Sequence, residues 1–201
     1  MLQITYQTRA LEYSQTREQW LERAAALMRD SLILQLGDRP YRSSCGWPSQ
    51  AAMARTKRRI GECWYPEHCT DHTNHNIFVS PALQDASLVL QTLAHELIHV
   101  VTGPKVGHKG QFVKIAKAIG FTKPWTSTPA TPALIERLND LISKLGPYPH
   151  AAIDRSGRKK QSTRLLKVIC PACGYTVRVT QQWIETGLPT CPCETQMEQA
   201  Q

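Results

Sequence analysis

The chain has 201 residues and a formal net charge of +8, and seven of its residues are cysteines. This length can bury the core of one ordinary domain with room for a small appendage, so a mini-protein is excluded. The N-terminal stretch is polar and no stretch approaches 18 consecutive apolar residues, so we expect neither a signal peptide nor a membrane span. We therefore expect a cytoplasmic, non-secreted protein whose clustered cysteines are metal ligands rather than disulfides.

The first part of the chain is predicted to contain a helix followed by strands. Residues 14–36 place apolar side chains at spacings of three and four, which indicates an amphipathic helix ending near Gly37. Three short runs rich in aromatic or β-branched residues then predict three strands, at 41–47, 59–65 and 76–80.

Three further helices are predicted after the strands. Asp85 is an N-cap candidate for a strongly apolar helix that Gly103 and Pro104 would end. A short amphipathic helix covers 110–120, and a last one covers 133–145.

The apolar helix carries a candidate metal site. His95 and His99 are four residues apart, so they lie one turn apart on the same side of the helix, with Glu96 beside them. This HExxH pattern is typical of zinc hydrolases, in which two imidazoles bind the metal and the carboxylate takes a proton from the attacking water. A structural role for the two histidines within a core is the alternative.

The third protein ligand of a catalytic zinc must come from elsewhere in the chain. Thr102 and Lys105 stand where the metzincin pattern requires Gly and His, so that class is excluded. No acidic residue occurs from 100 to 135, and Glu136 is the first candidate carboxylate. His108 is the favoured ligand, because the chain can turn after the helix and present it from the start of the next helix.

The strand that directly precedes the metal helix has two interpretations. Ile77 to Val79 either pair with an extended substrate, since edge pairing reads only backbone, or form an ordinary structural strand.

Four cysteines near the C-terminus predict a second, structural zinc site. They form a CxxC and a CxC pair, close to a four-cysteine zinc ribbon: Cys170, Cys173, Cys191 and Cys193. Reduced cysteines that are only partly liganded are the alternative, because the second pair departs from CxxC. A module this short would need the metal to fold.

A second group of histidines and cysteines runs from the second predicted strand through the loop that leads to the third. Its members are Cys63, His68, Cys69, His72 and His75. The spacing matches no standard metal site, so we favour ordinary loop residues here.

Basic residues surround the cysteine module without any acidic residue between 155 and 184. They are candidates for DNA contact: Arg155, Arg158, Lys159, Lys160, Arg164, Lys167 and Arg178. Tyr175 and Trp183 could stack on unpaired bases. A solvated basic surface is the alternative interpretation.

Four segments of the chain together resemble a known family. AHELIHV and GHKGQF, with FVSPAL before them and CPACGY near the C-terminus, resemble the SprT-like zinc metalloproteases, whose best-known eukaryotic relative is Spartan. The family pattern falls on His95, Glu96, His99, His108 and Phe112. The interval between the second and third histidine is short here, so a longer loop that contacts substrate in relatives is missing.

The resemblance implies a minigluzincin-like zincin core of the α+β class, with an N-terminal helix, a small three-stranded sheet and the HExxH helix. Residues 1–146 would form this metalloprotease domain, 147–162 a basic linker, and 163–201 a small β zinc ribbon with a polar tail. One zinc ion would be catalytic and one structural.

The resemblance also implies a zinc-dependent endopeptidase with Glu96 as the catalytic residue. Its protein substrates would be bound or crosslinked to DNA, with single-stranded DNA as a partner and nucleoid association as a possible location. The alternative is a DNA-associated binding protein in which the zincin core is a non-proteolytic scaffold.

Overall fold

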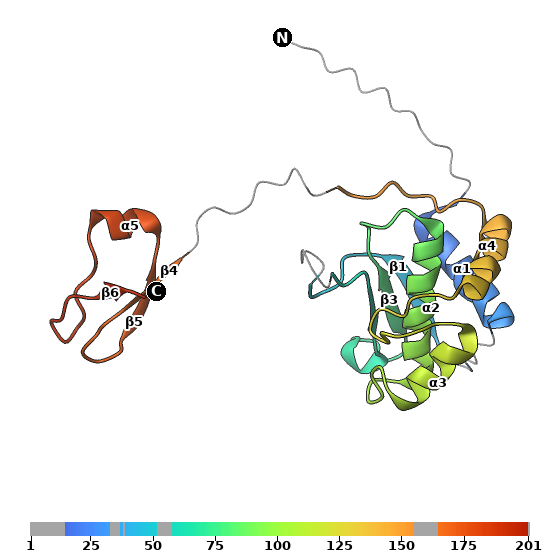
Figure 1. The fold of residues 1–201 in the computed structure, drawn as a ribbon, viewed down its shortest axis with the longest axis horizontal. Helices are drawn as coiled ribbons and strands as arrows, with labels where there is room; N and C mark the ends of the chain where they lie inside the picture. Colours follow the sequence, from blue (N-terminus) through green and yellow to red (C-terminus); the bar gives the residue numbers. More distant parts are fainter. Residues whose placement is uncertain (1–14, 33–36, 38, 52–57, 155–164, 201) are drawn as a thin grey trace, which may run out of the picture. The chain divides into compact units, whose positions relative to one another are not determined.

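A computed structural model describes residues 15–32, 37, 39–51, 58–154 and 165–200, and Figure 1 shows its ribbon. Contacts between residues divide the chain into a larger unit, Met1–Asp154, and a smaller one, Arg155–Gln201. Five α-helices and two three-stranded sheets occur in the described segments, so the fold is mixed α+β.

Helix α1, Arg17–Ser31, begins at a capping box. The side chain of Thr16 accepts a hydrogen bond from the Gln19 backbone, and the Gln19 side chain accepts one from the Thr16 backbone. The predicted helix end near Gly37 is corrected, since α1 ends at Ser31 with Leu32 as its C-cap. The apolar run continues past that point, so periodicity alone placed the end too late. Residues 33–36 lie outside the described residues.

The sheet of the larger unit has the order β1-β3-β2. Strand β1, Tyr41–Cys45, is parallel to β3, His75–Val79, and β2, Gly61–Trp64, is antiparallel to it. Both edges of β3 are therefore occupied, and the hypothesis that this strand pairs with substrate is wrong. Sequence order does not reveal strand order, and β2 lies at an edge of the sheet instead.

Helix α2, Ala86–Thr102, packs against this sheet and against the other helices (Figure 1). The predicted N-cap is confirmed, because the Asp85 side chain accepts a hydrogen bond from the Leu88 backbone. The predicted end is confirmed as well, with Gly103 at φ +79 as the C-cap. Most of α2 is buried, so the metal motif sits on a rigid element of the core.

Helices α3, Gly110–Ile119, and α4, Pro132–Leu145, both pack against α2. A short 3-10 helix, Pro66–His68, follows β2. Thr131 caps α4 by accepting a hydrogen bond from the Leu134 backbone. The Arg39 guanidinium donates to the backbone carbonyls of Val100 and Val101 near the end of α2.

Residues 147–154, which the sequence assigns to the linker, contact the larger unit. The Trp20 indole donates to the Gly146 carbonyl at 3.1 Å, just before this segment. His150 Nε2 lies 2.8 Å from the Pro81 carbonyl, and the Ile153 backbone donates to the same carbonyl at 2.9 Å. The larger unit thus extends to Asp154, and 155–162 lie outside the described residues.

The smaller unit is an antiparallel sheet with the order β5-β4-β6 and one short helix. Its elements are β4 Leu166–Ile169, β5 Thr176–Val179, α5 Gln181–Thr186 and β6 Glu198–Gln199. Among the described residues of this unit, the buried core consists of Val168, Cys170, Cys191 and Met197. Two of these four residues are members of the predicted zinc site.

Candidate metal centres

The three predicted histidine ligands converge on one point. His108 Nε2 lies 3.1 Å from His95 Nε2 and 3.2 Å from His99 Nε2. A zinc ion at the usual distance from imidazole would separate tetrahedral ligand nitrogens by about 3.3 Å. The three residues form one of two groups among the described residues that could hold a metal ion, so their geometry fits a zinc ion.

His108 reaches this point through the turn between α2 and α3. Gly107 adopts φ +54 in this turn, a conformation that favours glycine. The Phe112 ring is fully buried and packs on the imidazoles of His99 and His108, at centroid distances of 4.7 and 4.9 Å. Glu136, the alternative third ligand, is exposed on α4 and is not part of the group.

The histidines are neutral at physiological pH in the metal-free protein. Burial, followed by the neighbouring histidines, lowers the pKa of His95 to about 3 and that of His99 to about 4. Burial also lowers the pKa of His108. Because zinc binds the neutral imidazole, these shifts prepare the group for a metal ion.

Glu96 lies under strand β2. Its side chain is buried, and burial raises the pKa of its carboxyl group to about 8. A Cβ atom at Gly61 would lie 2.5 Å from Glu96 Oε1 and 2.6 Å from Thr92 Cγ2. Any larger residue at this position of β2 would require Glu96 and Thr92 to shift, so glycine leaves the space that the carboxylate fills.

The histidines and Glu96 open into a cavity of about 500 Å³. One wall is β2, from Gly61 to Trp64, and another is the segment Thr126–Thr128. This volume is within the range of ligand-binding clefts.

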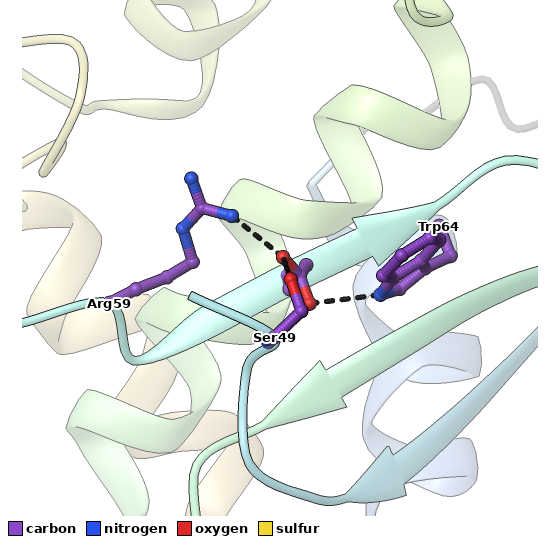
Figure 2. A network of polar contacts seen from close by, with 4 residues as sticks. Ser49, Arg59 and Trp64 are labelled. Atoms are coloured by element: carbon purple, nitrogen blue, oxygen red, sulfur yellow. Dashed lines mark hydrogen bonds and ion pairs between the residues drawn. The ribbon is translucent and has the colours of Figure 1, made fainter. Parts of the chain in front are cut away.

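Glu62 also lines this cavity, and a network of polar contacts joins its carboxylate to Ser49, Arg59 and Trp64, which are labelled in Figure 2. Its carboxylate accepts hydrogen bonds from the Ser49 backbone at 2.8 Å, the Ser49 hydroxyl at 2.7 Å, Arg59 at 2.6 Å and the Trp64 indole at 2.9 Å. Burial alone would raise the pKa of Glu62, but these hydrogen bonds outweigh burial and lower it. The network holds the chain before β2 against the strand.

The four cysteines of the smaller unit form the second candidate metal group. The Sγ atoms lie 3.6 Å apart for Cys170 and Cys193, and 3.5 Å apart for Cys173 and Cys191. A zinc ion bound by four thiolates would separate them by about 3.8 Å. The CxC pair, which departs from the usual ribbon spacing, therefore contributes both of its sulfur atoms to the group.

A nearby hydroxyl group favours the thiolate form of one of these cysteines, Cys193. The pKa of Cys193 falls to about 6, first because of its hydrogen bond with Thr195 and then because of the neighbouring cysteines. Because zinc binds the thiolate, the lowered pKa of Cys193 fits a metal ligand. The pKa of Cys191 is raised instead: a backbone hydrogen bond at Cys193 lowers it, but burial and hydrogen bonds with the other cysteines outweigh this effect.

The other histidine and cysteine group does not converge on a point within the described residues. Cys69 Sγ accepts a hydrogen bond from Asn76 at 3.0 Å, and His75 Nδ1 lies 3.1 Å from the Pro40 carbonyl. These local contacts fit the favoured interpretation of ordinary loop residues.

Two of the seven candidate DNA contacts are described. Lys167 and Arg178 are exposed and lie directly opposite each other on β4 and β5. The side chains of Tyr175 and Trp183 are 50% and 59% exposed. The remaining candidates, Arg155, Arg158, Lys159, Lys160 and Arg164, lie outside the described residues.

The sequence interpretation missed Thr128, Gly61 and Glu62. A glycine inside a strand can signal a close approach of another group, so Gly61 could have been noticed. Thr128 stands in the run TSTPATP, and no pattern distinguishes it from its neighbours.

The described residues contain no helix long and apolar enough to cross a membrane. The chain matches no protein-family model, and comparisons with curated proteins and with solved structures give no match either. Inference about function therefore rests on the residues and their geometry.

Proposed function

We propose that this chain is a zinc-dependent endopeptidase of the SprT-like type, with a zincin core, and that it acts on proteins bound or crosslinked to DNA. One observation carries the proposal: three neutral imidazoles converge at a cavity beside a buried carboxyl group. A purely structural metal site has no use for Glu96 in this position.

His95, His99 and His108 would hold the zinc ion. Bound zinc lowers the pKa of water and polarises a peptide carbonyl. Glu96 would take the proton from the attacking water and deliver it to the nitrogen of the leaving amine. The carboxyl pKa of about 8 belongs to the metal-free protein, and a nearby cation lowers it towards the ionised form that a base requires.

Strand β2 is the element that favours a peptide substrate. It is an edge strand of its sheet, and its residues line the cavity. An extended peptide could add to this edge by backbone hydrogen bonds, which tolerate many side chains. The strand that we propose to pair with substrate is therefore β2 and not β3.

Replacement of the proposed base tests the peptidase. Glu96→Gln should lower the rate of cleavage of an unfolded protein substrate by about 10²–10⁴-fold while zinc content stays at about two ions per chain. Glu136→Gln, the same change on the exposed face of α4, should leave the rate unchanged. Absence of zinc-dependent cleavage by the wild type, with and without DNA, would refute the peptidase and leave the non-proteolytic scaffold.

The exposed basic pair and aromatic residues of the smaller unit support the DNA part of the proposal. We expect single-stranded DNA to bind with an affinity that falls as salt rises. The double variant Lys167→Gln/Arg178→Gln should weaken binding and reduce the salt dependence, and truncation after Asp154 should weaken it further. Salt-independent binding, or binding that the truncated chain retains in full, would contradict this role.

A further inference from the structure

Thr128 lies at the back of the histidine site with an unusual backbone. Its side chain is 3% exposed, and its hydroxyl oxygen lies 2.8 Å from His95 Nδ1. Its φ angle is +40, which is rare for a β-branched residue. Such a conformation persists only where the surroundings enforce it.

The surrounding segment enforces this conformation. Phe121 and Ala130 pair as an antiparallel bridge and close the segment. Within it, the Thr128 backbone donates a hydrogen bond to the Pro124 carbonyl at 2.8 Å, and the Thr122 backbone donates to the Pro129 carbonyl at 2.8 Å. The hydrogen bonds within this loop thus hold the Thr128 hydroxyl next to His95.

The hydroxyl group decides which nitrogen of His95 can bind a metal. If His95 Nδ1 carries the proton and donates to Thr128, Nε2 keeps its lone pair, and Nε2 is the atom that faces His108. If Nε2 carried the proton instead, this nitrogen would have no free lone pair and could not bind the metal. His99 offers no comparable contact, because its Nδ1 is buried without a hydrogen-bond partner among the described residues.

We propose that Thr128 is a positioning residue that fixes the tautomer and ring orientation of His95 for metal binding. Outer partners of metal-bound histidines commonly act in this way. The inference rests on the metal site of the proposed function but not on peptide cleavage.

Three substitutions in one loop test this role by the affinity of the histidine site for Co²⁺ or Zn²⁺, measured by chelator competition in the full chain. Thr128→Val keeps the shape and the branched Cβ but removes the hydroxyl, and it should weaken affinity about 10–100-fold. Thr128→Ser keeps the hydroxyl and should stay within about threefold of the wild type. Thr122→Val removes an exposed hydroxyl that donates to the Pro129 carbonyl but keeps the backbone hydrogen bond to the same carbonyl, so it should change affinity by less than about threefold.

The tautomer of His95 gives a second readout that needs no metal. Proton–nitrogen correlation spectra of the metal-free wild type and of Thr128→Ser should show the proton on Nδ1. Unchanged metal affinity in Thr128→Val, or a proton on Nε2 in the wild type, would overturn the proposal. If Thr128→Val does not fold, the spectra of the wild type and of Thr128→Ser test the proposal.

Failure of this inference and failure of the peptidase are distinguishable. Normal metal affinity in Thr128→Val with cleavage intact would remove the role of Thr128 alone. A Thr128-dependent affinity in a protein that cleaves nothing would remove the peptidase alone.

Discussion

The three histidines lie on a helix and a turn that the large apolar core of the first unit holds in place, whereas two of the four cysteines are themselves half of the small core of the second unit. The histidines open into a cavity, whereas Cys170 and Cys191 are buried in the core of their own unit. We therefore expect the first unit to fold with or without a metal ion at its histidines, and the second unit to depend on a metal ion for its fold.

The largest expected effect comes from removing one thiolate. Cys191→Ser should unfold the second unit, because zinc–thiolate sites supply about 10–16 kcal/mol of apparent folding free energy at neutral pH. The first unit should keep its thermal transition and its zinc ion. A shift of the Trp183 indole resonance would report unfolding of the second unit. A fall in zinc content from about two to about one ion per chain would show that the first unit keeps its ion.

Cys45→Ser is the matched control for that change. Cys45 belongs to the first unit and to neither candidate metal group among the described residues, and its sulfur accepts a hydrogen bond from Arg17 that serine can also accept. Zinc content should stay at about two per chain. If Cys191→Ser instead leaves the Trp183 resonance unchanged, the second unit folds without its metal and the contrast between the units fails.

A smaller effect on stability is expected from the buried carboxyl group of Glu96 in the metal-free first unit. The pKa of Glu96 is about 8 in the folded state and 4.5 in a model compound. As pH rises from 4.5 to 8, the unfolded chain loses this proton while the folded chain keeps it, so folding becomes less favourable. Glu96→Gln removes this penalty and should stabilise the first unit by about 2–5 kcal/mol at pH 8 but very little near pH 4.5.

Urea unfolding of both proteins at the two pH values, in the presence of a chelator, measures this difference. The lowered pKa values of the histidines make folding less favourable as pH falls below 6.5, but both proteins share this effect and it cancels in the comparison. Added zinc should reduce the advantage of the Gln variant, because a cation favours the carboxylate. Equal stability of the two proteins at pH 8 would show that Glu96 ionises freely in the fold.

Local signals were sufficient for α2 and for the residues that meet at each metal group, but they placed the end of α1 too late and did not predict α5. Asp85 and Gly103 bound α2 as predicted, and elimination of other ligands pointed to His108, which lies with His95 and His99. These features depend on spacing, capping and turn chemistry, and each of these signals involves only a few neighbouring residues of the sequence.

Features set by distant contacts could not be predicted in the same way. The central position of β3 depends on pairing between strands from three places in the chain. The contact of His150 with the Pro81 carbonyl joins segments 69 residues apart. Thr128 and His95 are 33 residues apart, and no spacing rule relates them.

The smallest effect is expected from a change in the packing around Glu96 that removes no metal ligand. Gly61→Ala should cost about 1–3 kcal/mol of stability and lower cleavage about 10–100-fold, because the new methyl group displaces both Glu96 and Thr92. Gly46→Ala is the matched control, since its Cβ would lie 2.7 Å from the Phe78 ring, away from the site. It should lower stability similarly without changing kcat.

Thr92→Ser separates the two contacts of the new methyl group. It removes Cγ2 and keeps the hydroxyl that donates to the Leu88 carbonyl at 2.8 Å. In the double variant with Gly61→Ala, stability should recover in part while cleavage stays low, because the clash with Glu96 Oε1 remains. Recovery of both quantities would mean that Gly61 acts through Thr92 alone, and the position of the carboxylate would then not depend on β2.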